Sequence, residues 1–276
     1  MKTTSAHSAR QGFFSGVKMA MPIVTGYVPV SFAFGVLAVN VGLTPLDALL
    51  MGLLYFAGSG QLMTVAMLGA GAGFLPIILS TAVVNLRHVL MSAAMVPPLK
   101  RWPAWRKLIF AFGMTDETFA LHAGRFAKLE RDAAEAGLDV SVEAEAATPY
   151  SVAQTFGINV TSHISWISGG FLGALFGDRL GDVSALGLDY ALPAMFVALI
   201  APRLLDTRQC LVALAGGALS VAFVLWGEDQ WNIMLGALIA ATIGALLPGG
   251  GKPGAQDNGK PGAKDATLRE AGHVEP

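Results

Sequence analysis

Two long stretches of this chain contain no charged residue, and they constrain its fold more than any other feature. The first runs from Met19 to Leu46 and the second from Ala48 to Leu86. A helix needs about 20 apolar residues to cross a bilayer, so the first stretch fits one crossing and the second fits two. Only helices and closed barrels satisfy their backbone groups inside a membrane. The sequence therefore predicts an all-α, polytopic membrane helix bundle.

The composition agrees with a protein whose main surroundings are the lipid bilayer. Hydrophobic residues make up 54% of the chain and charged residues 13%, whereas soluble domains are about one-quarter charged. The net charge of −1 provides no basic field for nucleic acid, so we expect no nucleic-acid partner. Cys210 is the single cysteine and the five histidines are scattered, which predicts no metal site. We also expect no cofactor.

The chain divides into a tail at 1–11, a transmembrane domain at 12–247 and a disordered tail at 248–276, which is rich in glycine, proline and charge. Within the domain, we expect residues 125–149 to form a charged, solvent-exposed loop. About seven to eight hydrophobic segments are predicted, with broken or re-entrant helices as an open alternative. They are 19–46, two segments within 48–86 that meet at the glycine-rich turn 69–73, the marginal segment 108–124, 146–177, 183–202, 209–227 and 230–251.

The basic residues give conflicting signals about topology. The loop around Pro103 carries four cations and should face the cytoplasm, and the N-terminus is basic as well. Three crossings between them would place them on opposite sides of the membrane. Three explanations remain open: an external N-terminus, a re-entrant early segment, or an exception to the rule.

Two prolines lie inside predicted spans and are candidate helix-break positions. Pro29 and Pro193 each begin a P-x-x-F sequence, which is a weak sign of an internal repeat of the kind found in transporters. Asp189 lies near the start of the same segment as Pro193, where we expect an interfacial or capping residue.

The first polar cluster interrupts the second uncharged stretch at residues 56–61. Gly58 and Gly60 each lower helix stability by about 1 kcal/mol relative to alanine, which favours a broken helix whose N-terminal end faces a solute. Ser59 and Gln61 add polar side chains there. Close packing of small residues between helices is the structural alternative.

The second cluster is Asn85, Arg87 and His88. An arginine near the centre of a membrane costs about 2.5 to 3.5 kcal/mol on insertion scales, so it needs a partner. Arg87 either holds a carboxylate of a solute or pairs with Asp116, Glu117 or Asp189 in a structural role. On a regular helix the three side chains cannot all face one pocket. His88 either relays a proton or is a hydrogen-bonded interior residue.

The third cluster contains Asp116 and Glu117, which point about 100° apart on a helix. One carboxylate can therefore pair with Arg87 while the other meets a proton or an ammonium group. Solvated carboxylates at the end of a surface helix are the alternative.

Together these motifs resemble the AzlC-type family of branched-chain amino acid exporters. The matching elements lie in order over about residues 12–247 and are Gly26-x-x-Pro29 with Phe32 and Gly35, Phe56-Ala57-Gly58-Ser59-x-Gln61, Asn85-x-Arg87-His88, Thr115-Asp116-Glu117-x-Phe119-Ala120, and Gly187-Leu188-Asp189-Tyr190-Ala191-Leu192-Pro193-Ala194. The resemblance implies a multi-pass permease of the bacterial inner membrane rather than an enzyme. It also implies export of leucine, isoleucine, valine or related hydrophobic amino acids, a small AzlD-type membrane subunit as partner, and a proton gradient as energy source.

The residues themselves lead to the hypothesis of alternating access around a site near Ser59 and Arg87, with an apolar wall at Phe32, Met63 and Phe119. A transporter or channel for another small solute and a non-catalytic membrane scaffold are alternatives. An intramembrane serine protease could pair Ser59 with His88 or His163. That reading is disfavoured because the stretch 56–61 lacks the first glycine of the G-x-S-G pattern.

Overall fold

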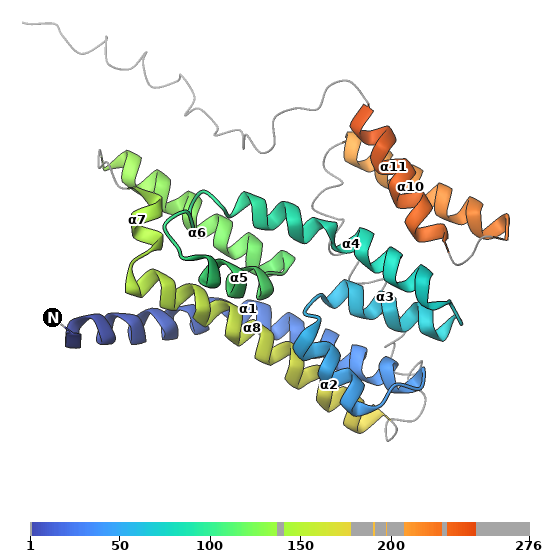
Figure 1. The fold of residues 1–276 in the computed structure, drawn as a ribbon, viewed down its shortest axis with the longest axis horizontal. Coiled ribbons are helices and arrows are strands. Elements are labelled where there is room, and N and C mark those ends of the chain that lie inside the picture. Colours follow the sequence, from blue (N-terminus) through green and yellow to red (C-terminus); the bar gives the residue numbers. More distant parts are fainter. Residues whose placement is uncertain are drawn as a thin grey trace, which may run out of the picture.

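The computed structural model describes residues 2–136, 141–177, 190, 197, 207–227 and 231–246, and these residues contain helices and no strand. The predicted all-α helical membrane fold is confirmed (Figure 1). The helices are α1 (Lys2–Asn40), α2 (Pro45–Leu54), α3 (Gly58–Gly69), α4 (Phe74–Ala94), α5 (Ala104–Phe112), α6 (Asp116–Glu135), α7 (Val142–Ala146), α8 (Pro149–Phe176), α10 (Thr207–Leu225) and α11 (Asn232–Leu246). Two of them are long and apolar enough to span a bilayer, namely α1 over Ala6–Asn40 and α4.

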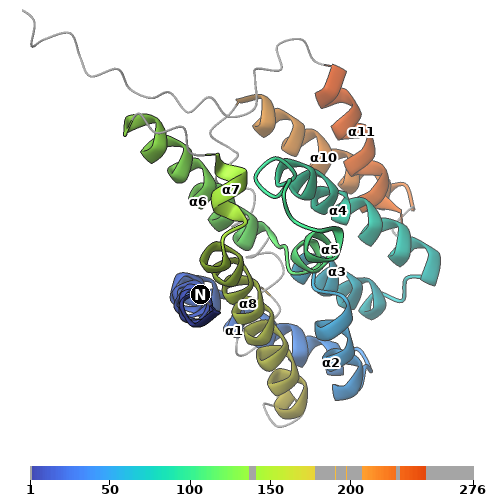
Figure 2. The same cartoon turned by 60° about the vertical axis from the view of Figure 1, so that its left-hand side comes forward.

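The helices α1 and α8 form the longest contact of the fold and run parallel to each other (Figures 1 and 2). Near their beginnings Gly12 lies against the backbone of Tyr150, and further along Gly35 lies against the backbone of Gly170. A side chain at either glycine would collide with main-chain atoms. Small residues at these positions let the two backbones approach closely, as is common between membrane helices.

Pro29 does not break α1, which contrasts with its prediction as a helix-break position. The helix continues through Pro29 from Lys2 to Asn40. Close packing against α8 lies on both sides of the proline, at Gly16 and at Gly35. Neighbouring helices make proline tolerable inside membrane helices, and α8 provides that support here.

The helices α2 and α3 form a re-entrant unit, which we call the first hairpin. Thr44 and Asp47 cap the start of α2 through reciprocal hydrogen bonds, and these bonds to the Asp47 carboxylate lower its pKa. The chain breaks at 55–57, and α3 then returns to the end where α2 began, because Gly69 at its last turn lies beside Val41 after α1. The hairpin packs its apolar face on α1 and α8 through Phe34, Ala38, Ala48, Leu62, Val65 and Ala174.

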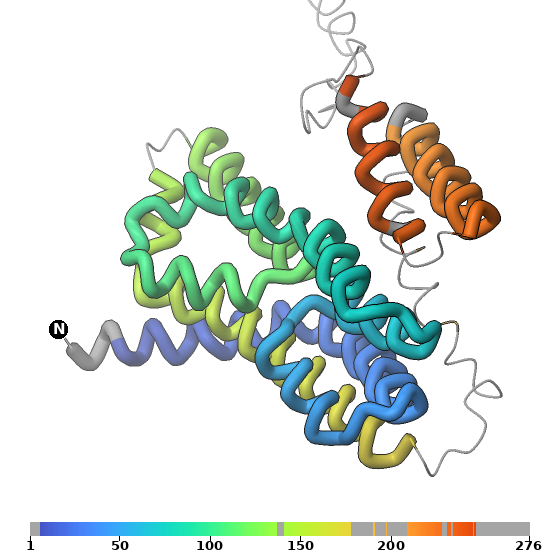
Figure 3. Tube along the Cα trace, turned by 45° about the vertical axis from the view of Figure 1, so that its right-hand side comes forward, coloured from blue at the N-terminus to red at the C-terminus, as the bar shows by residue number. Residues whose placement is uncertain are grey.

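The helix α4 crosses to the opposite end, where α5 and α6 form the second hairpin. This hairpin breaks at 113–115, inside the segment 108–124 that was expected to be one short span or one surface helix. At its base the Lys100 ammonium lies 3.6 Å from the Glu143 carboxylate, and the Trp102 indole donates to the carbonyl of Ala146 at 2.9 Å. The two hairpins thus start from opposite ends of the molecule and meet in the middle (Figure 3).

This arrangement corresponds to the re-entrant alternative for the topology. The basic loop after α4 is tied to residues 143–146, which directly precede α8. The start of α8 lies against Gly12 of α1. The basic N-terminal part of the chain and the basic loop therefore lie at the same end of the molecule, because α1 and α4 run in opposite directions and the first hairpin returns to the end at which it began.

The charged segment 125–149, expected to be solvent-exposed, is largely helical where the structure describes it, and most of its described residues are exposed or half-buried. It contains the second half of α6 and all of α7, and it buries Phe126, Ala133 and Ala146. Phe126 and Ala133 are seven residues apart and so lie on one face of α6. Phe126 and Ala146 belong to the same buried cluster as Phe110 of α5. At the other end of the chain, α10 and α11 pack together through Gly216 and Gly236, as expected for the segments 209–227 and 230–251.

Several predictions fall on residues outside the described part of the structure. They concern Asp189, Pro193, most of the segment 183–202 and the tail 248–276. The proposed repeat of the P-x-x-F sequence depends on Pro193 and so remains a prediction.

Candidate functional site

A small cavity lies where the breaks of the two hairpins meet, between α1, α4 and α8. Its volume is about 30 Å³, which is room for roughly one or two water molecules. We call it the central cavity, and its lining residues are Tyr27, Phe56, Ala57, Gly58, Ser59, Arg87, His88, Thr115, Asp116, Glu117 and Trp166. It unites parts of all three polar clusters identified in the sequence.

Gln61 holds the break of the first hairpin in place. Its amide nitrogen donates to the carbonyls of Met51 at 2.8 Å and Tyr55 at 2.5 Å, and its amide oxygen accepts from the Trp166 indole at 2.7 Å. Carbonyls freed at a helix end inside a membrane need such partners. Gln61 is fully buried and does not line the cavity. In this structure Gln61 supports the helix break. Its place in a substrate or proton pathway stays a prediction.

The N-terminal end of α3 opens onto the cavity without a side-chain cap. Ala57 occupies the capping position and makes no side-chain hydrogen bond, and the next residues, Gly58 and Ser59, line the cavity. The first amides of a helix have no partner within it, and their dipoles favour an anionic group. The structure has the predicted break, at residues 55–57. Close packing of small residues, the structural alternative, is also observed, because a side chain at Gly58 would collide with the Trp166 ring.

The second hairpin caps its own break. Thr115 caps α6 by accepting from the amide of Thr118 at 3.3 Å, while the Thr118 hydroxyl accepts from the amide of Thr115 at 2.8 Å. The Thr118 hydroxyl also reaches the carbonyl of Gly113 at 3.3 Å. This geometry fixes Asp116 and Glu117 in the first turn of α6, where the helix dipole stabilises negative charge.

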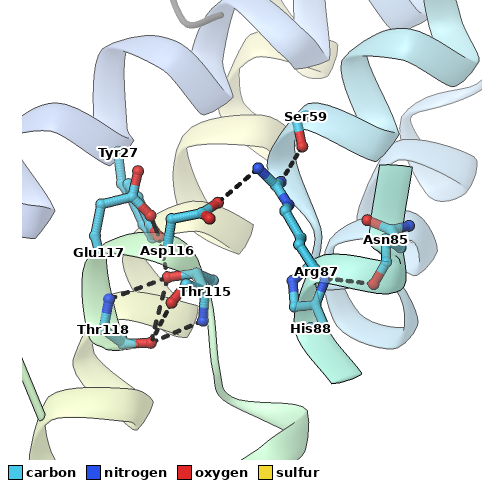
Figure 4. Close-up of polar contacts among 9 residues, drawn as sticks. All are labelled: Tyr27, Ser59, Asn85, Arg87, His88, Thr115, Asp116, Glu117 and Thr118. Carbon is cyan, nitrogen blue, oxygen red and sulfur yellow. Dashed lines mark hydrogen bonds and ion pairs between the residues drawn. The ribbon is translucent and has the colours of Figure 1, made fainter. Parts of the chain in front are cut away.

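Arg87 connects the two hairpins across the cavity, as Figure 4 shows. One terminal nitrogen of its guanidinium lies 2.8 Å from the Asp116 carboxylate, and the other donates to the hydroxyl of Ser59. Both charged side chains are about one-quarter exposed, at 27% and 28%. The predicted pairing of Arg87 with one carboxylate of the third cluster is therefore observed, and Asp116 is the partner.

Glu117 takes a different environment from Asp116. Its carboxylate accepts a hydrogen bond from the Tyr27 hydroxyl at 2.6 Å, and the Tyr27 oxygen lies 2.5 Å from that of Thr115. Because the single Tyr27 proton points to Glu117, the Thr115 hydroxyl donates to Tyr27. Within the described residues no cation forms an ion pair with Glu117. The two adjacent carboxylates thus point apart, as expected for a helix, and only one of them is neutralised by a cation.

Of the three polar side chains on α4, Arg87 and His88 line the cavity and Asn85 does not, in agreement with the expectation that the three cannot all face one pocket. Asn85 donates to the Tyr55 hydroxyl at 2.7 Å and does not line the cavity, so it supports the first break. His88 lines the cavity, and its Nδ1 lies 3.3 Å from the carbonyl of Asn85. Gly60 is close to the same contact, because a side chain there would meet the Tyr55 hydroxyl and the Asn85 amide.

The apolar lining comes from residues that the sequence analysis did not select. Tyr27, Phe56 and Trp166 line the cavity, and the Tyr27 ring packs edge-on against both of the others. None of the predicted wall residues, Phe32, Met63 and Phe119, is among the lining residues. Trp166 had a detectable signal, because it follows a polar series on α8 that marks the interior-facing side of that helix.

Within the described residues, Ser59 does not form the serine–histidine pair that the serine protease alternative requires. The Ser59 hydroxyl accepts from Arg87. Neither histidine considered for the pair hydrogen bonds to it, since His88 contacts the Asn85 carbonyl and His163 contacts the Gly52 carbonyl at 2.8 Å. A group of histidine, cysteine or acidic side chains able to hold a metal ion is also absent from the described part.

Comparisons with known proteins identify relatives across most of the chain. An uncharacterized membrane protein of Archaeoglobus fulgidus is 33% identical over 86% of this chain and 94% of its own length. The inner membrane protein YgaZ of Escherichia coli is 30% identical over 85% of this chain and 88% of its own length. The branched-chain amino acid transport protein AzlC of Bacillus subtilis is 25% identical over 84% of each chain. No solved structure matches the chain significantly.

The family comparison covers the site. The family model described as AzlC protein matches residues 22–180, which is more than half of the chain and includes both hairpins and every residue that lines the central cavity. The chain therefore belongs to the AzlC protein family.

Proposed function

We propose that this chain is the large subunit of an inner-membrane permease that exports branched-chain or related hydrophobic L-amino acids. The name of the Bacillus subtilis relative supports an amino acid substrate of this class. The observation that carries the proposal is the opposition, across one cavity, of an uncapped helix N-terminus and two carboxylates. Such a pair of charges complements a zwitterion.

The carboxylate of the amino acid binds at the start of α3 and at Arg87. The amides of the first turn and the guanidinium both favour an anion there. Arg87 is already engaged by Asp116 and Ser59, so the substrate carboxylate competes with Asp116 for the guanidinium. Displaced from Arg87, the Asp116 carboxylate becomes available to the substrate ammonium group. Binding of the substrate therefore opens the connection between the hairpins.

Glu117 carries the coupling proton in this proposal. Its carboxylate has a hydroxyl partner and no paired cation among the described residues, so protonation breaks no ion pair. His88 lines the same cavity and provides a second group on the proton path. The aromatic side chains of Tyr27, Phe56 and Trp166 accept the aliphatic side chain of the substrate.

The central cavity must open for transport, because about 30 Å³ is far less than a leucine molecule needs. Alternating access meets this requirement if the two hairpins separate at one end at a time. We further propose that a small AzlD-type membrane subunit assembles with this chain and that the complex resides in the bacterial inner membrane. In this view the chain is a transporter and not an enzyme.

The test is efflux of preloaded radiolabelled leucine, valine and glycine from cells that express this chain alone or with an AzlD-type subunit. We expect partner-dependent export of leucine and valine and little export of glycine. Arg87→Lys should reduce export at least about tenfold, because lysine lacks the planar fork that reaches two partners. Arg101→Lys, at an exposed position in the basic loop, is the matched control and should leave export unchanged.

Equal efflux from empty cells, with both chains confirmed in the membrane, would remove the amino acid assignment. The same cells would then be tested with other small solutes. Full activity of Arg87→Lys would show that Arg87 does not bind the substrate carboxylate through two hydrogen bonds.

A further inference from the structure

A second and larger cavity lies between α6, α7 and α8, towards the end that carries the basic loop. Its volume is about 190 Å³. We call it the outer cavity, and it is lined by Arg125, Phe126, Lys128, Leu129, Asp132, Glu145, Tyr150, Ser151 and Gln154. It shares no lining residue with the central cavity, so the proposed transport site does not account for it.

Arg125 is the unusual residue of the outer cavity. One terminal nitrogen of its guanidinium donates to the hydroxyl of Thr155 at 2.7 Å and approaches that of Ser151 at 3.4 Å. The other terminal nitrogen is buried without a hydrogen-bond partner. Among the described residues, no carboxylate lies within ion-pairing distance of Arg125. Besides the two neutral hydroxyls, its positive charge meets only the face of the Phe126 ring, 4.7 Å from the guanidinium carbon, among the described contacts.

This environment is costly for the protein unless an anion completes it. A buried cation without a counter-ion loses hydration that hydroxyl groups replace only in part. The planar guanidinium fork is suited to carboxylate and phosphate groups, which it binds through two parallel hydrogen bonds. The adjacent cavity provides the space for such a group.

Besides Lys128, the rest of the lining contains two carboxylates, which can meet a positive charge on the ligand. Asp132 follows Arg125 by seven residues, which places both on the same face of α6, two turns apart. Glu145 approaches the cavity from the α7 side. Neither carboxylate forms an ion pair with a described cation. Phe126 and Leu129 add apolar surface between the charged groups.

We propose that the outer cavity binds a zwitterion, with its anionic group on Arg125 and its ammonium group facing Asp132 and Glu145. Two sources have this chemistry: a free hydrophobic amino acid and the headgroup of phosphatidylethanolamine. The site is separate from the transport site, and its occupancy is measured by binding. Its failure would therefore leave the proposed function untouched, and the reverse also holds.

The experiment uses the full-length chain purified into lipid nanodiscs and distinguishes the two sources. In one arm, the unfolding temperature is compared between phosphatidylcholine nanodiscs and nanodiscs that also contain phosphatidylethanolamine. In the other arm, equilibrium dialysis in pure phosphatidylcholine measures radiolabelled leucine binding in the Arg87→Lys background, which weakens the central site. Leucinamide, which lacks the carboxylate, and 4-methylpentanoate, which lacks the ammonium group, are the competitors.

We expect a clear signal in one of the two arms. Arg125→Gln should weaken that binding about tenfold or more, because it removes a charge-assisted contact. Arg131→Gln, at an exposed position on the same helix, should leave it unchanged. In the leucine arm, neither competitor should displace the label as well as leucine does.

A second variant keeps the test decisive if Arg125→Gln fails to fold. Asp132→Asn changes an exposed residue, leaves Arg125 in place and should weaken binding several-fold. The proposal is overturned if neither ligand binds the chain carrying Arg125. It is equally overturned if binding is the same with Arg125→Gln, or, where that variant does not fold, with Asp132→Asn.

Discussion

Each of the two hairpins that meet at the central cavity contains a helix break, and they provide partners for the backbone groups at the break in different ways. In the first hairpin, Gln61 reaches back from α3 to bind carbonyls around the break, and the N-terminus of α3 stays uncapped. In the second, Thr115 and Thr118 cap the break themselves, and two carboxylates follow directly. The first hairpin therefore presents the positive end of the α3 dipole to the cavity, and the second hairpin presents negative charge. This difference gives the cavity a polarity that can orient a zwitterion.

The largest effect should follow from removing the carboxylate of Glu117, which forms no ion pair with a described cation. Glu117→Gln keeps an acceptor for the Tyr27 hydroxyl but cannot carry a proton. We expect leucine export driven by a pH gradient to fall to background in proteoliposomes, whereas exchange of labelled for unlabelled leucine continues. Glu130→Gln, at an exposed position on the same helix, serves as the control. A retained response to the pH gradient would assign the proton to another group and weaken the contrast between the hairpins.

An intermediate effect should follow from removing the support of the first break. Gln61→Leu leaves the carbonyls of Met51 and Tyr55 and the Trp166 indole without their partner. Since each buried unsatisfied group costs about 1 to 3 kcal/mol, the free energy of unfolding should fall by at least about 2 kcal/mol. Chemical denaturation in detergent measures this change. Gln209→Leu, at an exposed position on α10, should change stability little. Equal stability of both variants would show that Gln61 is not what holds the break.

The smallest effects should come from exchanging the capping states of the two hairpins. Thr115→Ala removes the cap of α6 and should cost about 1 kcal/mol of stability. Ala57→Ser adds a hydroxyl at the uncapped start of α3, where it competes with the substrate for the first amides. We expect it to weaken leucine binding several-fold without loss of stability. Tighter binding in Ala57→Ser, measured by equilibrium dialysis, would contradict a substrate carboxylate at this helix end.

The sequence alone predicted the elements of the site better than their arrangement. Glycines in an apolar helix and charges inside a long uncharged stretch are costly, so Gly58, Arg87 and Asp116 were identified as functional candidates from residue chemistry. Which carboxylate pairs with Arg87 depends on the direction in which α6 leaves its break. That direction is a property of tertiary packing and has no signal in the local sequence.

Polar residues that hydrogen bond to the backbone are the hardest to interpret from the sequence. From the sequence, a polar side chain such as Gln61 in an apolar segment is interpreted as facing a solute. In the structure its partners are two carbonyls that lack a helical partner because the helix is broken. The second break was missed for a related reason, since residues 113–115 lie in a segment that also fits one continuous helix. Tyr27 and Trp166 were missed because aromatic residues in apolar helices usually face lipid or the core.

The glycine seam between α1 and α8 has a mechanical consequence. Two helices whose main chains touch at several levels along their length resist sliding and tilting, because either motion would bring larger side chains against the partner's main chain. The pair α1–α8 is therefore rigid, and both hairpins pack against it. A change in the shape of the central cavity then arises from movement of the hairpins and α4 relative to this pair. The pair α1–α8 is the fixed part of the protein.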